Sequence, residues 1–200
     1  IPPNPGIDCV YEGAAVARKA GCDFVIAIGG GSPMDAAKVI ALLAKTDVPQ
    51  EKLFAGSYGA DILPMVFVPT TAGTGSEVTP YAIITNDAAE TKTGIATPLF
   101  FPKLALLDAK YIKSLSHSTM VNTVVDSLSH SVEGMLSVRA SALSDALAVK
   151  GIALVGECLG PLAEGTLSEE QREKLLLAST LGGMVISNTG TTAVHAMGYS

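Results

Sequence analysis

The stretch Phe24-Val25-Ile26-Ala27-Ile28-Gly29-Gly30-Gly31-Ser32-Pro33 decides the fold of the first half of the chain. Its first five residues form a short apolar run, which is typical of a buried parallel strand. Pro33 suits the first position of a helix, which we predict to run to about Ala44.

Between this strand and this helix, glycines allow the backbone to turn sharply and a ligand to approach closely, and the helix start offers N–H groups to phosphate. A phosphate-binding loop and a tight structural turn are the two interpretations, and three glycines in a row favour the first for Gly29, Gly30, Gly31 and Ser32. The usual dinucleotide fingerprint is absent, because Met34 stands where its third glycine would be.

A second loop repeats this arrangement. The strand predicted at Met65–Val68 is followed by residues 69–77, which are rich in hydroxyl side chains such as Thr70, Thr71 and Thr74. In isolation this is a long polar loop, but two such loops at successive strand ends indicate one shared crevice. A helix capped by Asp8 and ending at Gly21, with further strands at 81–85, 92–96 and 104–108, completes the pattern of a doubly wound α/β domain.

The strand signals stop near residue 110. Helical patterns then run through 116–136, 141–159 and 168–187, the last beginning with a capping-box spacing from Ser168 to Gln171. We therefore predict a partial α/β dinucleotide-binding domain at 1–109 and a partial helical metal-binding domain at 110–200. The chain opens without Met and stops at Ser200 without a closing element, so we expect it to be truncated at both ends.

Composition excludes several classes of protein. The chain of 200 residues is 48% hydrophobic and 16% charged, and its net charge of −6 comes without any Lys/Arg cluster, which argues against nucleic-acid binding. Three cysteines without CxxC spacing are typical of buried thiols in a reducing compartment. Lys38, Lys150 and Glu157 interrupt the best apolar runs, so we predict neither a membrane span nor a signal peptide, and a cytoplasmic protein.

Asp126 and His130 stand four residues apart on a predicted helix, which places them on one face about 6 Å apart along the axis. We predict that this face lies opposite the apolar stripe formed by Val121, Val124, Val125, Leu128 and Val132. Alone, Asp126 and His130 would form an ordinary contact on a solvated helix face. We assign no function to Glu133 or His117. His195, within a stretch rich in glycine and threonine, adds a third donor. Such mixed oxygen and nitrogen ligands suit Fe(II), Zn(II) or a similar ion.

Four ordered motifs resemble those of the iron-containing alcohol dehydrogenases. They are Gly29-Gly30-Gly31-Ser32-Pro33-Met34-Asp35-Ala36-Ala37-Lys38, Pro69 to Thr79, Asp126-Ser127-Leu128-Ser129-His130 and Val194-His195-Ala196-Met197. The resemblance implies a Rossmann-like N-terminal part, an all-helical C-terminal part as in the dehydroquinate synthase-like architecture, and an active site between them. It also implies an oxidoreductase that transfers a hydride between NAD or NADP and a small aliphatic alcohol or aldehyde polarised by a divalent metal, with Fe(II) favoured and Zn(II) as the alternative.

The resemblance assigns roles to individual residues. The metal ligands would be Asp126, His130 and His195, and the family's fourth ligand, another histidine, would lie beyond the chain end. Tyr199 stands where the family often has a histidine proposed to relay protons, so a phenol would act there. The residues expected to contact the dinucleotide are Gly29, Gly30, Gly31, Ser32, Asp35, Thr70, Thr71, Thr74 and Lys92.

Two other functions stay open at this point. A dehydroquinate synthase-like lyase would need several Lys and Arg residues to hold a sugar phosphate, and none stands beside the Asp/His motif. A non-catalytic domain that keeps the fold would not need Asp126, His130 and His195. The expected binding partner is a small alcohol or aldehyde, and we expect neither nucleic acid nor a membrane as a partner. Assembly into a homo-oligomer is compatible with the sequence. The 200-residue chain alone is expected to be weakly active or inactive.

Overall fold

The computed structural model describes residues 1–86, 91–192 and 195, and it divides the chain into two compact units. The first unit comprises residues 1–68 and 80–106, and the second comprises residues 69–79 and 107–200. The hydroxyl-rich loop after the second predicted strand therefore groups with the helical half, although it lies between α/β elements in the sequence. The predicted domain boundary between residues 109 and 110 stays a prediction.

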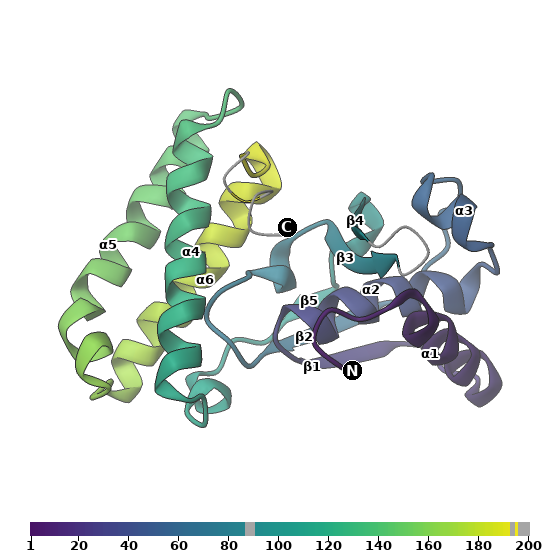
Figure 1. Cartoon of the computed structure of the whole chain (residues 1–200), viewed down its shortest axis with the longest axis horizontal. Coiled ribbons are helices and arrows are strands. Elements are labelled where there is room, and N and C mark those ends of the chain that lie inside the picture. Colours follow the sequence, from purple (N-terminus) through teal and green to yellow (C-terminus); the bar gives the residue numbers. More distant parts are fainter. Residues whose placement is uncertain (87–90, 193–194, 196–200) are drawn as a thin grey trace. The chain divides into compact units, whose positions relative to one another are not determined.

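A three-stranded sheet forms part of the first unit (Figure 1). Its strand order is β1 (Val25–Gly29), β2 (Met65–Pro69) and β5 (Leu104–Ala105), and β2 and β5 pair in parallel with Val66 opposite Leu104. Helices α1 (Ile7–Ala20) and α2 (Gly31–Lys45) pack on each other, and α2 also packs on β1. The other elements of this unit are α3 (Gln50–Phe54), the antiparallel hairpin β3 (Tyr81–Asn86) and β4 (Thr91–Ala96), and the 3₁₀ helix η3 (Pro98–Phe100).

The core of this unit is apolar and aliphatic, as the composition indicates. Val10 and Ala14 of α1, Leu42 of α2 and Ile84 of β3 belong to one buried cluster, while Met34 and Phe67 belong to a second cluster between α2 and the sheet. β1 was predicted to be buried, but Ile26 and Ile28 are 53% and 64% exposed. The prediction was wrong for one face of β1, because among the described residues α2 covers only the face that carries Ala27.

Several element boundaries differ from the sequence prediction for local reasons. Asp8 does not cap α1, because Gly6 is the capping residue and forms an isolated bridge with Thr85 before the helix begins. β5 is shorter than predicted, since the side chain of Asp108 accepts the Lys110 N–H and caps the 3₁₀ helix η4 (Ala109–Ile112). The predicted strand at 104–108 therefore ends early, where a capping carboxylate starts the next element.

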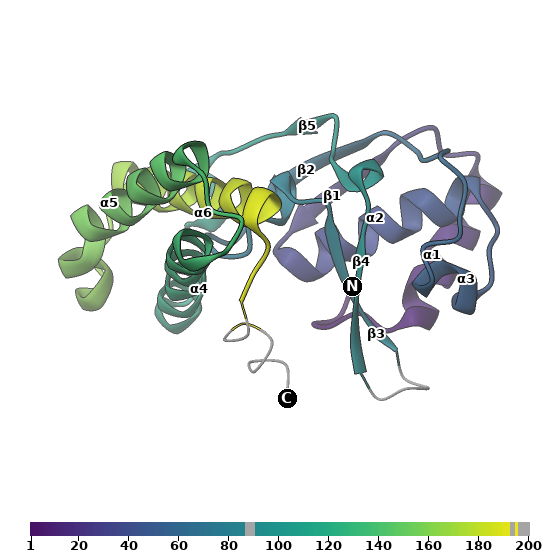
Figure 2. The ribbon, with the colours of Figure 1, turned by 90° about the horizontal axis from the view of Figure 1, so that it is seen from above.

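Three long helices form the second unit, as Figure 2 shows from above. They are α4 (His117–Leu136), α5 (Ala142–Glu164) and α6 (Glu169–Thr189), and each packs against the other two around a buried cluster that includes Val124, Leu154 and Leu175. The 3₁₀ helix η1 (Ser76–Val78) packs on α6. α5 runs through Pro161 and ends at Gly165, beyond its predicted end at Leu159. By length and composition α5 could also cross a membrane, a property shared by core helices of bundles.

The capping box predicted at the start of α6 is confirmed. The Ser168 hydroxyl accepts the Gln171 N–H at 3.2 Å, and the Gln171 side chain accepts the Ser168 N–H at 2.8 Å. Replacing Ser168 with alanine is expected to lower the free energy of unfolding by about 1 kcal/mol, whereas aspartate at this position should leave it nearly unchanged. Urea unfolding followed by circular dichroism measures both variants. An unfolding free energy that Ser168→Ala leaves unchanged would show that the side-chain cap contributes nothing.

Candidate metal centre and nucleotide loops

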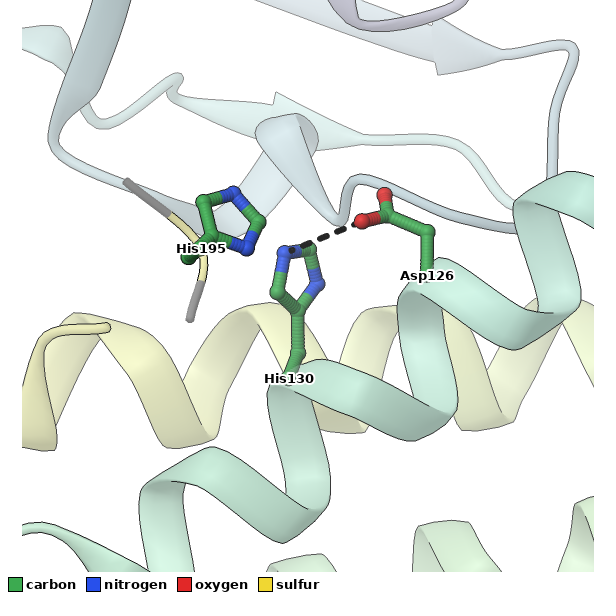
Figure 3. Close-up of side chains that lie close together, drawn as sticks. All are labelled: Asp126, His130 and His195. Atoms are coloured by element: carbon green, nitrogen blue, oxygen red, sulfur yellow. Dashed lines mark ion pairs between the residues drawn. The ribbon is translucent and has the colours of Figure 1, made fainter. Parts of the chain in front are cut away.

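The three predicted metal ligands lie together in the second unit (Figure 3). One turn of α4 brings the Asp126 Oδ1 within 3.6 Å of the His130 Nε2, and the ring centroid of His195 lies 5.1 Å from that of His130. One potential ligand atom from each of the three residues lies within 4.8 Å of the other two. A carboxylate oxygen and two imidazoles that converge in this way match the ligands of Fe(II) and Zn(II) sites in proteins.

The surroundings of His130 favour a neutral ring. The residue is only 3% exposed, and burial lowers the pKa of His130 below its ordinary value, although Asp126, Glu133 and the backbone of Gly73 act in the opposite direction. The Nδ1 atom of His130 is buried without a hydrogen bond to the described residues. A neutral imidazole is the form that donates a lone pair to a metal, so the residues present fit a divalent ion.

The prediction about the face of α4 that carries this pair was wrong. His130, Ser127 and Ser131 are buried, whereas Val125 and Val132 are 56% and 41% exposed. α4 crosses its neighbours through small residues: an added Cβ at Gly182 of α6 would lie 3.1 Å from the Ser127 carbonyl oxygen, and one at Gly151 of α5 would lie 3.1 Å from the Ser131 hydroxyl. Val124 of the predicted stripe is buried among the three helices while Val125 and Val132 are exposed, so the stripe marks the packed face only in part.

Glu133 is a functional candidate that the sequence reasoning missed. Its side chain is 5% exposed; one oxygen accepts both the N–H and the hydroxyl of Thr192 at 2.7 Å, and the other accepts the Ser129 hydroxyl at 2.9 Å. The Nδ1 of His195 lies 3.5 Å from Glu133 Oε1. Burial opposes ionisation, but the hydrogen bonds from Thr192 and Ser129, together with His195, lower the pKa of Glu133 below its ordinary value. The available signal was its spacing, three residues after His130 on the same helix face.

The glycine loop lies in the first unit, where β1 leads into α2. Gly30 caps α2 without a side-chain hydrogen bond, so the first N–H groups of the helix are the donors at this end. Ser32 accepts the Asn4 N–H through its hydroxyl. The Asp35 carboxylate accepts the Ile83 N–H at 3.0 Å and lies 3.6 Å from the fully buried Lys38 ammonium. Asp35 thus ties the start of α2 to the β3–β4 hairpin.

The remaining residues predicted to bind the dinucleotide are distributed over both units. Lys92 is exposed on β4 of the first unit. Thr70, Thr71 and Thr74 are half-buried in the loop that groups with the helices, and Thr74 accepts the Ser76 N–H. The structure therefore brings the threonine loop, but not the whole predicted set, into one unit with the metal cluster. Tyr199 and its neighbours Val194, Ala196 and Met197 lie outside the described residues.

The threonine loop is seated on the helices that carry the metal cluster. An added Cβ at Gly73 would lie 2.7 Å from the Cβ of Thr123, one turn before Asp126 on α4. Gly75, in the left-handed region with φ of 60°, approaches Gly183 of α6 so closely that an added Cβ would lie 2.6 Å from its Cα. The buried Glu77 accepts the Thr180 hydroxyl at 2.8 Å. These contacts hold the loop beside His130, whose ring interacts with the Gly73 backbone.

Comparison with known proteins agrees with this fold. Residues 1–109 match the family described as iron-containing alcohol dehydrogenase, and residues 120–200 match the C-terminal domain of the same family. Because these matches cover most of the chain, it belongs to the iron-containing alcohol dehydrogenase family. The predicted Rossmann-like and helical parts and the predicted family are thereby confirmed, and nothing in the comparisons favours the lyase.

Several relatives show how far the similarity extends. The chain is 37% identical over 204 residues to alcohol dehydrogenase 4 of Schizosaccharomyces pombe, covering 100% of this chain and 47% of that protein. It is 34% identical over 203 residues to the lactaldehyde reductase of Escherichia coli, covering 100% and 52%. Among solved structures, an iron-containing alcohol dehydrogenase of Thermotoga maritima is 44% identical with a TM-score of 0.90, covering 100% of this chain and 54% of the other.

A second solved structure contains a cofactor. The sulfoacetaldehyde reductase of Bifidobacterium kashiwanohense, described in complex with NAD+, is 36% identical with a TM-score of 0.91, covering 98% of this chain and 53% of the other. The chain thus spans about half the length of the relatives that it matches.

Proposed function

We propose that this chain forms part of a metal-containing, nicotinamide-dependent alcohol dehydrogenase that interconverts small aliphatic alcohols and aldehydes. The observation that carries the proposal is the convergence of Asp126, His130 and His195 in a chain of this family. These three residues would hold the divalent ion, with Fe(II) favoured by the family and Zn(II) as the alternative. When bound, such an ion acts as a Lewis acid on the oxygen of the alcohol or aldehyde.

The protein itself holds the proposed metal ligands in a fixed arrangement before an ion binds. α4 holds Asp126 and His130 at fixed spacing, and burial keeps the His130 ring neutral. The Glu133 carboxylate and the helix crossings around Ser127 and Ser131 limit the freedom of the same segment. A site that is preformed in this way loses little ordering entropy when it binds an ion and substrate.

The cofactor in this proposal is NAD, with NADP as the alternative, and NAD is supported by the similarity to a reductase described in complex with NAD+. The N–H groups at the start of α2 would bind phosphate, and the threonine loop would place the nicotinamide end near the metal ligands. The residues proposed to bind it are Gly29, Gly30, Gly31, Ser32, Asp35, Thr70, Thr71, Thr74 and Lys92. Tyr199 is proposed as a proton relay. The full protein is proposed to be cytoplasmic and able to form homo-oligomers.

The test is aldehyde-dependent oxidation of NADH and of NADPH by the full-length protein, purified anaerobically, stripped with a chelator and reloaded with Fe(II) or Zn(II). We expect turnover that disappears on chelation, returns with metal and is faster with NADH. The measurement is the decrease in absorbance of the reduced nicotinamide. Bound metal and bound dinucleotide without turnover of any short aldehyde would contradict the proposal.

A further inference from the structure

Glu133 is a buried carboxylate in contact with His195, a proposed metal ligand. Its Oε2 accepts two hydrogen bonds from Thr192, and its Oε1 accepts the Ser129 hydroxyl and lies 3.5 Å from the His195 Nδ1. Burying a carboxylate is costly unless donors satisfy it, and here three donors and an imidazole surround it. Such a group is expected to fix the position of what it binds.

His195 is the ligand that needs such a fixed position. Asp126 and His130 belong to the regular part of α4, whereas α6 ends at Thr189 and Gly190 turns the chain with a φ of 70°. Just before that turn, the Ser137 hydroxyl donates to the Thr189 carbonyl, and beyond it Glu133 of α4 accepts the N–H and the hydroxyl of Thr192. Glu133 therefore joins the segment that carries His195 to the helix that carries the other two ligands.

We propose that Glu133 is a positioning residue of the metal centre, which holds His195 in place by anchoring Thr192 and by contacting the imidazole. This inference rests on the proposed function. The spacing of Asp126, His130 and Glu133 along α4 places all three on one face, so a single helix supplies two ligands and the support of the third. Partners of ligating histidines orient the ring and strengthen metal binding, and their loss typically costs about 10- to 100-fold in affinity.

The test measures Co(II) binding to the metal-free, full-length protein by calorimetry and by the visible absorption spectrum, which reports the ligand geometry. Glu133→Gln keeps the shape and one acceptor oxygen but removes the charge that faces His195. We expect it to bind Co(II) about 10- to 100-fold more weakly with an altered spectrum. Thr192→Val removes one hydroxyl donor from a surface segment, so it should fold and bind Co(II) several-fold more weakly.

Ser144→Ala is the control, because Ser144 is as buried as Glu133 and lies in the same unit, but its hydroxyl donates to the Ser141 carbonyl at the start of α5. It should lose stability yet keep the parent's Co(II) affinity and spectrum. If Glu133→Gln and Thr192→Val bind Co(II) like the parent while Asp126→Ala does not, the role of Glu133 is refuted and the metal site stands. A parent that takes up no Co(II) overturns the proposed function and this inference together.

Discussion

Replacing Asp126 with alanine in the full-length protein is expected to lower kcat/KM for aldehyde reduction by at least about 1,000-fold, because a metal contributes several kcal/mol of charge stabilisation and each 1.4 kcal/mol is tenfold. Asp126 is the only carboxylate of the described ligand cluster and lies 3.6 Å from the His130 Nε2. Its loss leaves two imidazoles, which bind a divalent ion more weakly than three ligands do. The measurement is steady-state oxidation of NADH at saturating metal, together with the metal content of the purified variant.

The control for this variant is His117→Ala. His117 is exposed at the start of α4, about 13 Å along the axis from Asp126, and its ring forms a hydrogen bond with the Leu162 carbonyl. Its loss should leave kcat/KM and metal content near those of the parent. Because Asp126 is half-exposed, its replacement should not unfold the protein. An Asp126→Ala variant that retains the parent's metal content and turnover would exclude this cluster as the metal centre.

The features of the fold and of the candidate site that local sequence patterns encode were predicted, and the features that depend on distant partners were not. The glycine loop, the capping box at Ser168 and the four-residue spacing of Asp126 and His130 each occupy a few consecutive residues, so propensity and periodicity reveal them. Glu133 depends on Thr192, 59 residues away, and Asp35 depends on Ile83, 48 residues away. The hydrophobic periodicity of a sequence carries no information about contacts between residues so far apart.

The buried face of α4 shows a second limit of sequence patterns. Of the valines in the predicted stripe, Val124 is buried while Val125 and Val132 are exposed. The helices cross at Ser127, Ser131 and Gly134, and the buried face also carries His130. Hydrophobic periodicity finds the face that buries the most apolar area. It does not find a face on which helices approach through small residues and which also carries polar ligands, since those side chains resemble a solvated surface.

The threonine loop groups with the helices, and its backbone contacts at Gly75 and Gly183 hold it beside the proposed metal ligands. Gly183→Ala is therefore expected to lower the free energy of unfolding by about 3 kcal/mol, at the upper end of ordinary overpacking. The added Cβ would lie 2.6 Å from the Gly75 carbonyl oxygen and 2.9 Å from its Cα, and backbone atoms cannot move aside as a flexible side chain can. The measurement is the urea midpoint of the full-length protein, with NADH affinity as a second readout.

Gly156→Ala, on α5, tests whether this loss arises from the contact or from the substitution itself. Nothing lies within 4 Å of an added Cβ at Gly156, which sits on the exposed side of the helix. Alanine is a better helix former than glycine by about 1 kcal/mol, so the same change should raise stability there. Opposite signs at the two positions would mean that Gly183 is required for the loop to reach α6. Stabilisation at both would mean that the loop is not seated on α6 and that its threonines are not held near His130.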